Sequence, residues 1–240
     1  MKLINVLLVL SGFTLTANAQ VRVSSVDVGP SYNVGRFLKS TFQGASGIGT
    51  EANVRMQLNS NWSLMFGLGY ADLVLDQYDP INNWNWGFYI TPYSGLVSSI
   101  LRDTTYKATF EPNQHLYIVP VSAVFIAKLP SIEGIRFYAG AGGELQLYQR
   151  HLWVHEYWSK YYPTYNYTFS YDYNNDAGLK VGTMYALKAL LQLEYPFSER
   201  LGAILQISVV DYLAAQNDFS YSNFPMKVLA SSILGLRFYY

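Results

Sequence analysis

The sequence predicts an all-β fold, an eight-stranded antiparallel up-and-down transmembrane β-barrel. Three observations carry this prediction. Eight segments of the 240-residue chain alternate apolar and polar residues with a period of two, which is typical of strands. The connections between these segments alternate between short and long, as in membrane barrels. The last segment, residues 226–240, ends on an aromatic residue, and pairing it with the first strand leaves no open sheet edge.

Composition excludes several other classes of protein. Half of the residues are hydrophobic, 13% are charged, and the formal net charge is zero, so nothing favours a nucleic-acid partner. The chain has no cysteine, which excludes disulfides, thiolate metal sites, a catalytic cysteine and a lipoprotein anchor. The length allows one large β domain or two small ones.

Residues 1–19 predict a cleaved secretory signal peptide. Lys2 supplies the positive start, and the apolar run at residues 3–15 is short for a membrane span. Small residues at 17–19 fit a cleavage site, which leaves residues 20–240 as the barrel domain. A retained anchor helix is the alternative.

The first four strands are expected at residues 23–35, 47–58, 62–75 and 114–129. Asp72 breaks the alternation of the third, which predicts a bulge or the edge of the membrane. Pro120 lacks an N–H group, which predicts a bulge in the fourth. The long connection at residues 76–113 leaves two alternatives open. It holds either a hairpin, 96–101 with 104–110, or two further strands.

The last four strands are expected at residues 135–150, 181–195, 201–213 and 226–240. On the second of these, Leu191 is expected to face lipid and Gln192 the interior. Residues 130–134 and 196–200 form short turns. Residues 151–179 are interpreted as a long loop rich in tyrosine and tryptophan.

The polar faces of the strands carry charges of both signs, whereas the apolar faces carry almost none. One lysine or arginine at the bilayer midplane would cost about 2–4 kcal/mol. The polar faces therefore predict an interior network of ion pairs in a barrel too narrow to conduct, with a charged pore as the alternative. The residues of this predicted network are Asp27, Glu51, Arg55, Arg136, Glu144, Lys188, Glu194 and Arg237.

Aromatic residues fall at both ends of the apolar faces, as in the two girdles at membrane interfaces. The predicted interface residues are Tyr32, Trp62, Tyr70, Tyr117, Phe137, Tyr185, Tyr195, Phe238 and Tyr240. Because membrane barrels have short periplasmic turns and long external loops, both termini are expected in the periplasm.

Three stretches resemble the small-barrel families of bacterial outer-membrane proteins. The final strand, with its terminal aromatic residue, resembles their assembly signal. Residues 115–125 (HLYIVPVSAVF) and 137–145 (FYAGAGGEL) resemble two consecutive strands of the outer-membrane β-barrel domain, including the PorT-like group. The resemblance implies a porin-like fold in the Gram-negative cell envelope. It also implies contact with outer-membrane lipid and lipopolysaccharide, and recognition of the last strand by the barrel-assembly machinery.

No cofactor, metal or catalytic residue is predicted. His151 and His155 lie four residues apart beside Glu156, but a third metal ligand is not apparent. The favoured function is a structural or surface-interaction role, in which the aromatic loops either bind glycan or protein or pack on one another and on lipopolysaccharide. A component of a secretion or transport machine, implied by the PorT-like resemblance, is one alternative. An outer-leaflet lipid-modifying enzyme that uses His115 or His151 is the other.

Overall fold

The structure, a computed structural model, describes residues 22–37, 41–213 and 224–240. The predicted signal peptide lies outside these residues. Within them, no helix is long and apolar enough to cross a membrane.

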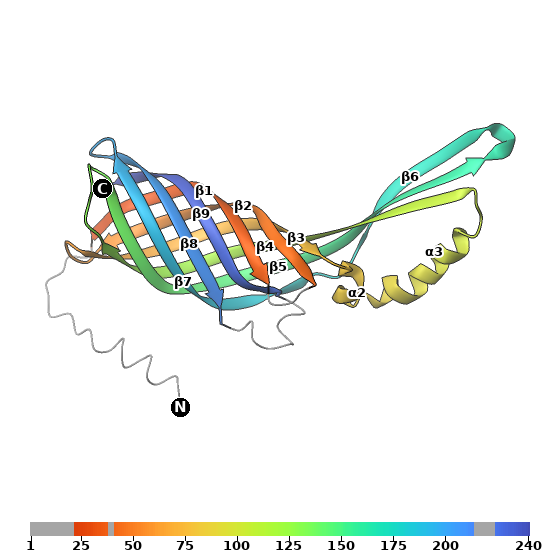
Figure 1. Cartoon of the computed structure of the whole chain (residues 1–240), viewed down its shortest axis with the longest axis horizontal. Helices are drawn as coiled ribbons and strands as arrows, with labels where there is room; N and C mark the ends of the chain where they lie inside the picture. Colours follow the sequence, from red (N-terminus) through yellow and green to blue (C-terminus); the bar gives the residue numbers. More distant parts are fainter. Residues whose placement is uncertain (1–21, 38–40, 214–223) are drawn as a thin grey trace, which may run out of the picture.

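Eight antiparallel strands close into a ring, so the predicted up-and-down barrel is confirmed (Figure 1). The first and last strands pair directly, with Val26 opposite Phe238 and Asp27 opposite Arg237. The ring consists of β1 (Arg22–Phe37), β2 (Phe42–Gln57), β3 (Trp62–Gln77), β4 (Tyr106–Lys128), β5 (Arg136–Tyr162), β7 (Lys180–Pro196), β8 (Leu201–Tyr212) and β9 (Met226–Tyr239).

Side chains along the strands alternate between the interior and the outer surface of the ring. On β7, Leu191 is 61% exposed outside the ring, whereas its neighbour Gln192 is 1% exposed. This period of two confirms the predicted register of the strand, because a slip of one residue would exchange the faces.

The two predicted bulges are absent. Strands β2 and β3 keep one register past Asp72, and β4 keeps one register with both neighbours past Pro120. Pairing between β3 and β4 stops for two residues at Pro120 and resumes unshifted. The missing N–H group therefore interrupts the ladder without adding a residue to it.

The hairpin predicted at residues 96–101 and 104–110 is wrong, and so is the alternative of two further strands. The chain forms α2 (Pro80–Trp84), the π-helix η1 (Tyr89–Tyr93) and α3 (Ser94–Ile100). Leu96, Val97 and Ile100 recur at helical spacing, which the β-branched composition of this stretch conceals. Only Tyr106 onward is strand, as the start of β4.

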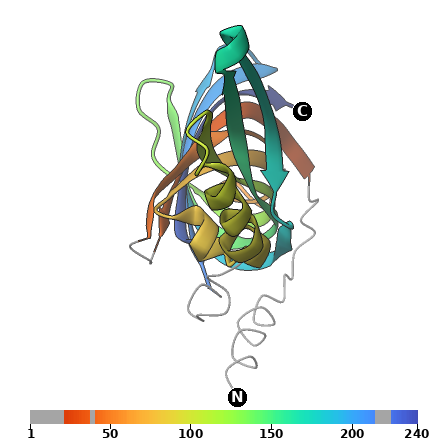
Figure 2. The same cartoon turned by 90° about the vertical axis from the view of Figure 1, so that its right-hand side faces the viewer.

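The loop predicted at residues 151–179 is also wrong. Strand β5 runs on to Tyr162, a 3-10 turn η2 (Pro163–Tyr165) follows, and β6 (Tyr167–Asp176) returns antiparallel to β5. Strand β6 is a ninth strand, outside the ring. The extended strands project from the long-loop end of the barrel (Figures 1 and 2).

Candidate functional site: a sheet beyond the barrel and the closed interior beneath it

The charged interior residues form two groups. Nearest the short-turn end, Arg237 binds Asp27 through Nε and Nη2, at 2.6 and 2.5 Å, and also pairs with Glu194. Arg136 donates to the same Glu194 at 2.8 Å, and Arg55 lies 3.9 Å from it. These residues place three positive charges against two negative ones.

The second charged group lies deeper in the barrel. Lys188 Nζ is 3.1 Å from a carboxylate oxygen of Glu51 and 3.0 Å from one of Glu144. Its surplus of one negative charge balances the first group, so the eight predicted interior charges sum to zero. All eight except Arg136 are buried.

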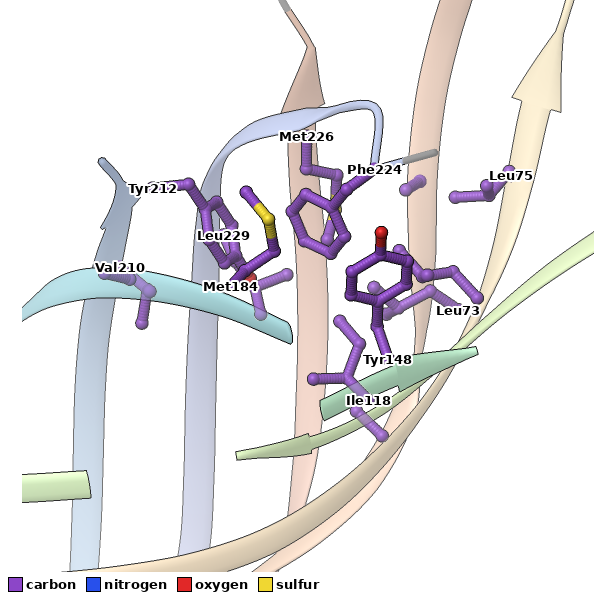
Figure 3. Close-up of a cluster of buried hydrophobic side chains, with 14 of the residues drawn as sticks. Leu73, Leu75, Ile118, Tyr148, Met184, Val210, Tyr212, Phe224, Met226 and Leu229 are labelled. Atoms are coloured by element: carbon purple, nitrogen blue, oxygen red, sulfur yellow. The ribbon is translucent and has the colours of Figure 1, made fainter. Parts of the chain in front are cut away.

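The long-loop half of the interior is apolar, a feature that the sequence reasoning missed. Phe224 packs against Tyr148 and Tyr212, with ring centroids 4.9 and 4.7 Å apart. Figure 3 shows these rings and their aliphatic neighbours pointing toward one another inside the wall. These rings belong to a larger buried apolar cluster, here called the plug. It also includes Leu73, Leu75, Leu116, Ile118, Met184, Val210, Met226 and Leu229. Residues 73–75 and 116–118 carry apolar side chains on both faces of their strands. This departure from alternation was the sequence signal that could have indicated an apolar interior at this level.

Helix α2 places Trp84 over the plug at the mouth of the barrel, which is the opening at its long-loop end. The indole ring lies 4.9 Å from the Arg150 guanidinium and 4.4 Å from Lys180 Nζ. Leu152 and Ala177 pack on the same ring system. Burial and the nearby Arg150 lower the pKa of Lys180 to about 8.

Above the mouth, β4, β5 and β6 form a three-stranded sheet, here called the extension. It comprises residues 106–113, 151–162 and 167–176. Residues 151–162 alone are about 40 Å long, because a β-strand rises about 3.3 Å per residue. Because β5 is continuous from the barrel wall, the extension is anchored in the barrel.

One face of the extension carries most of its aromatic residues, and the other, here called the polar face, is mainly polar but includes Trp153, Tyr157 and Tyr161. Directly opposed residues share a face, so Trp158 of β5 lies beside Ala108 of β4 and Tyr171 of β6. The aromatic face carries Tyr106, Phe110, Trp158, Tyr162, Tyr167, Phe169, Tyr171 and Tyr173. Its five outermost rings, those at 162, 167, 169, 171 and 173, are 36–55% exposed. Large exposed apolar patches of this kind mark interaction sites.

Glu156 joins the helical segment to the extension. Its buried carboxylate accepts hydrogen bonds from Tyr93 at 2.6 Å and Tyr89 at 3.3 Å, both on η1. It also accepts from Tyr173, Trp158 and Asn175 at 2.9, 2.8 and 2.6 Å. Burial raises the pKa of Glu156, but these hydrogen bonds outweigh burial and leave the pKa below its usual value.

The three histidines lie on the polar side of β4 and β5, and each contacts an aspartate. His115 Nδ1 is 2.8 Å from Asp72, and His151 Nε2 is 2.9 Å from Asp176. His155 Nε2 is 3.3 Å from Asp172. The described residues contain no group of three ligands suited to a metal ion, and no serine–histidine hydrogen bond occurs among them. Among the described residues the histidines therefore pair with aspartates and not with serines.

The predicted interface aromatics point outward from the ring at its two ends. Tyr32, Tyr70, Tyr117 and Tyr185 lie toward the long-loop end, below the extension. Toward the short-turn end lie Trp62, Phe137, Tyr195, Phe238 and Tyr240.

No family model matches the sequence, and no curated protein matches it. Among solved structures, the Neisserial surface protein A is 14% identical, with 90% of this chain and 96% of that chain covered and a TM-score of 0.46. A major outer membrane protein from Thermus thermophilus is 11% identical, with 90% and 100% covered and a TM-score of 0.47. The outer membrane protein OprG from Pseudomonas aeruginosa is 7% identical, with 92% and 97% covered and a TM-score of 0.44. These likenesses assign no family and no activity, and the resemblance to the PorT-like group stays a prediction.

Proposed function

We propose that this chain is an integral protein of the bacterial outer membrane whose barrel is closed. In this proposal the barrel holds the extension outside the cell for contact with another macromolecule. The outer part of the aromatic face carries the proposal, because the rings of Tyr167, Phe169 and Tyr171 stay exposed there. The helical segment covers only the inner part of this face, where η1 contacts Glu156 and Tyr173.

The outer surface of the ring supports the membrane location. Its outward side chains are mostly apolar along the strands, and they include Leu68, Leu187, Leu191 and Ile207, each more than half exposed. Aromatic residues border this band at both ends. A closed ring also satisfies the backbone hydrogen bonds of every strand, which lipid requires.

The interior supports a closed barrel. Ion pairs occupy the short-turn half, the apolar plug fills the long-loop half, and Trp84 covers the mouth. An ion crossing this interior would have to leave water and pass through the plug, which is strongly unfavourable. We therefore assign function to the extension and not to a conduction path.

Two measurements test the proposal. Because the chain has no cysteine, single-cysteine variants give unambiguous labelling. An impermeant maleimide should label Tyr165→Cys, at the tip of the extension, in intact cells. It should label the matched Ser60→Cys, in a short turn, only after the outer membrane is opened. The reverse pattern would refute this topology.

Planar-bilayer recording tests the closed barrel. The purified protein should give no sustained current. A large, stable and reproducible conductance would show that the plug does not seal the barrel.

A further inference from the structure

Strand β6 presents an open edge. It pairs with β5 on one side only, and nine of its ten residues are exposed. Figures 1 and 2 show no described segment along its outer side. An exposed edge of this length offers a row of unpaired N–H and C=O groups that another strand can bind.

The two edges of the extension differ in their side chains. The β4 edge carries Lys107 and Pro112, residue types with which proteins discourage strand addition. The β6 edge, YTFSYDYNND, contains no lysine, arginine or proline. The extension is therefore protected on one edge and left receptive on the other.

The sequence of β6 is complementary to itself in one antiparallel register. If two copies pair about Tyr171, each Tyr173 lies opposite Phe169 of the second copy, and each Asp172 lies opposite Ser170. On one face aromatic residues then meet aromatic residues, except that Tyr167 lies opposite Asn175, and on the other face polar residues meet polar residues. Aromatic pairs of this kind stabilise a sheet, whereas like charges directly opposed destabilise it.

Neighbouring registers fit less well. A shift that centres the pair on Asp172 places two aspartates opposite each other. The register between these two pairs Tyr171 with Asp172 of the second copy. It places every aromatic residue opposite a polar one, because a slip of one residue exchanges the faces. Centring on Ser170 avoids both faults but pairs only residues 167–173, whereas centring on Tyr171 pairs residues 167–175.

We propose that β6 pairs antiparallel with β6 of a second copy of this chain, centred on Tyr171. The result is a six-stranded sheet with one barrel at each end. Because the two barrels point in opposite directions, the paired copies lie in two membranes that face each other. The inference rests on the proposed function, since the extension must be outside the cell, and it names the partner: the same protein on a neighbouring cell.

Single-cysteine crosslinking of the full-length purified protein in detergent tests the register. Directly opposed Cα atoms in antiparallel strands are about 4.5–5.5 Å apart, within the range that a disulfide spans. Tyr171→Cys should form disulfide-linked dimers under mild oxidation. Tyr162→Cys, on the same face but on the inner strand β5, should not. Phe169→Cys and Tyr173→Cys should crosslink when mixed, and neither should do so alone.

Charge variants test the pairing without a covalent bond. Ser170→Asp places like charges opposite Asp172 at two symmetric positions and should raise the dimer dissociation constant roughly 2- to 30-fold. Ser170→Lys should leave it unchanged or lower it. Thr109→Asp puts the same charge on the same face at the β4 edge and should have no effect.

The oligomeric state, measured by sedimentation, and the crosslinking pattern together test the pairing of β6 with β6. A chain that stays monomeric, or that crosslinks through Tyr162→Cys as readily as through Tyr171→Cys, overturns the pairing. If such a chain is still labelled at Tyr165→Cys in intact cells, the topology of the proposed function stands and only the self-pairing is lost. Labelling at Ser60→Cys in intact cells would overturn both.

Discussion

Replacing Glu156 by glutamine should release the helical segment from the extension. The carboxylate accepts five hydrogen bonds, all from uncharged groups, and two of the donors, Tyr89 and Tyr93, belong to η1. The amide of Glu156→Gln keeps one acceptor oxygen and adds an NH2 group that faces other donors. At least two hydrogen bonds to a charged acceptor are lost, each contributing about 1.5–3 kcal/mol.

Allowing for relaxation, we expect local opening of this junction to become easier by about 2–4 kcal/mol. Amide exchange in residues 89–100 should then be roughly 30- to 1,000-fold faster, since about 1.4 kcal/mol corresponds to a factor of ten. Hydrogen–deuterium exchange of the detergent-solubilised protein measures this directly. Tyr93→Phe removes one donor and should give a smaller increase, and Glu111→Gln, at the exposed β4 edge, is the matched control.

Acid should have the same effect as the substitution. The pKa of Glu156 lies below its usual value in the folded protein, so its contribution to stability is complete above the unfolded value of ~4.3. That contribution is lost as the pH falls through the lower, folded pKa. Exchange in residues 89–100 that is unchanged by Glu156→Gln would show that the carboxylate does not hold the junction.

Three substitutions in the barrel have expected costs that unfolding in lipid vesicles can measure. Leu191→Arg places a charge against hydrocarbon and should cost about 2–4 kcal/mol, and equal stability would mean that β7 does not face lipid. Arg237→Met leaves the buried Asp27 without its charged partner, whereas Glu194 keeps Arg136, and it should cost about 3–5 kcal/mol. A mild effect would argue against the ion-pair network. Gly47→Ala drives a methyl group into the backbone carbonyl of Asp72 and should cost about 1–3 kcal/mol. The control Gly143→Ala places its methyl group in open space and should be nearly neutral. Equal effects of the two substitutions would refute the close approach of Gly47 to Asp72.

The ring itself followed from the sequence because each wall strand has one face on the outer surface of the ring and one toward its interior. The alternation around Leu191 and Gln192 therefore placed both residues in the correct environments. The same reasoning failed where the environment changes along a strand. Leu73 and Ile118 point inward although they are apolar, because they fill the plug near the mouth. A rule that assigns polar residues to the interior has no means of finding an apolar layer within it.

The extension was missed for a related reason. Apolar residues follow one another at 152–154 and 157–158, so the apolar–polar alternation of a wall strand is not visible in residues 151–162. A membrane-spanning strand also needs only about 9–11 residues. Strand β5 has 27 residues, so a span-length expectation ends it too early. Glu156 was noted only as a neighbour of two histidines. Its five donors come from three separate segments, and only the fold brings them together.

The continuity of β5 has a mechanical consequence for the extension. A flexible loop that presents aromatic residues loses conformational entropy when it binds, and this loss weakens binding. Strand β5 passes from the barrel wall into the extension without a break, and β4 flanks it over the same length. Glu156 then fixes η1 against the base of the extension. The rings of β6 are therefore already ordered before a partner arrives, so little ordering cost remains to be met when a second strand pairs with the open edge.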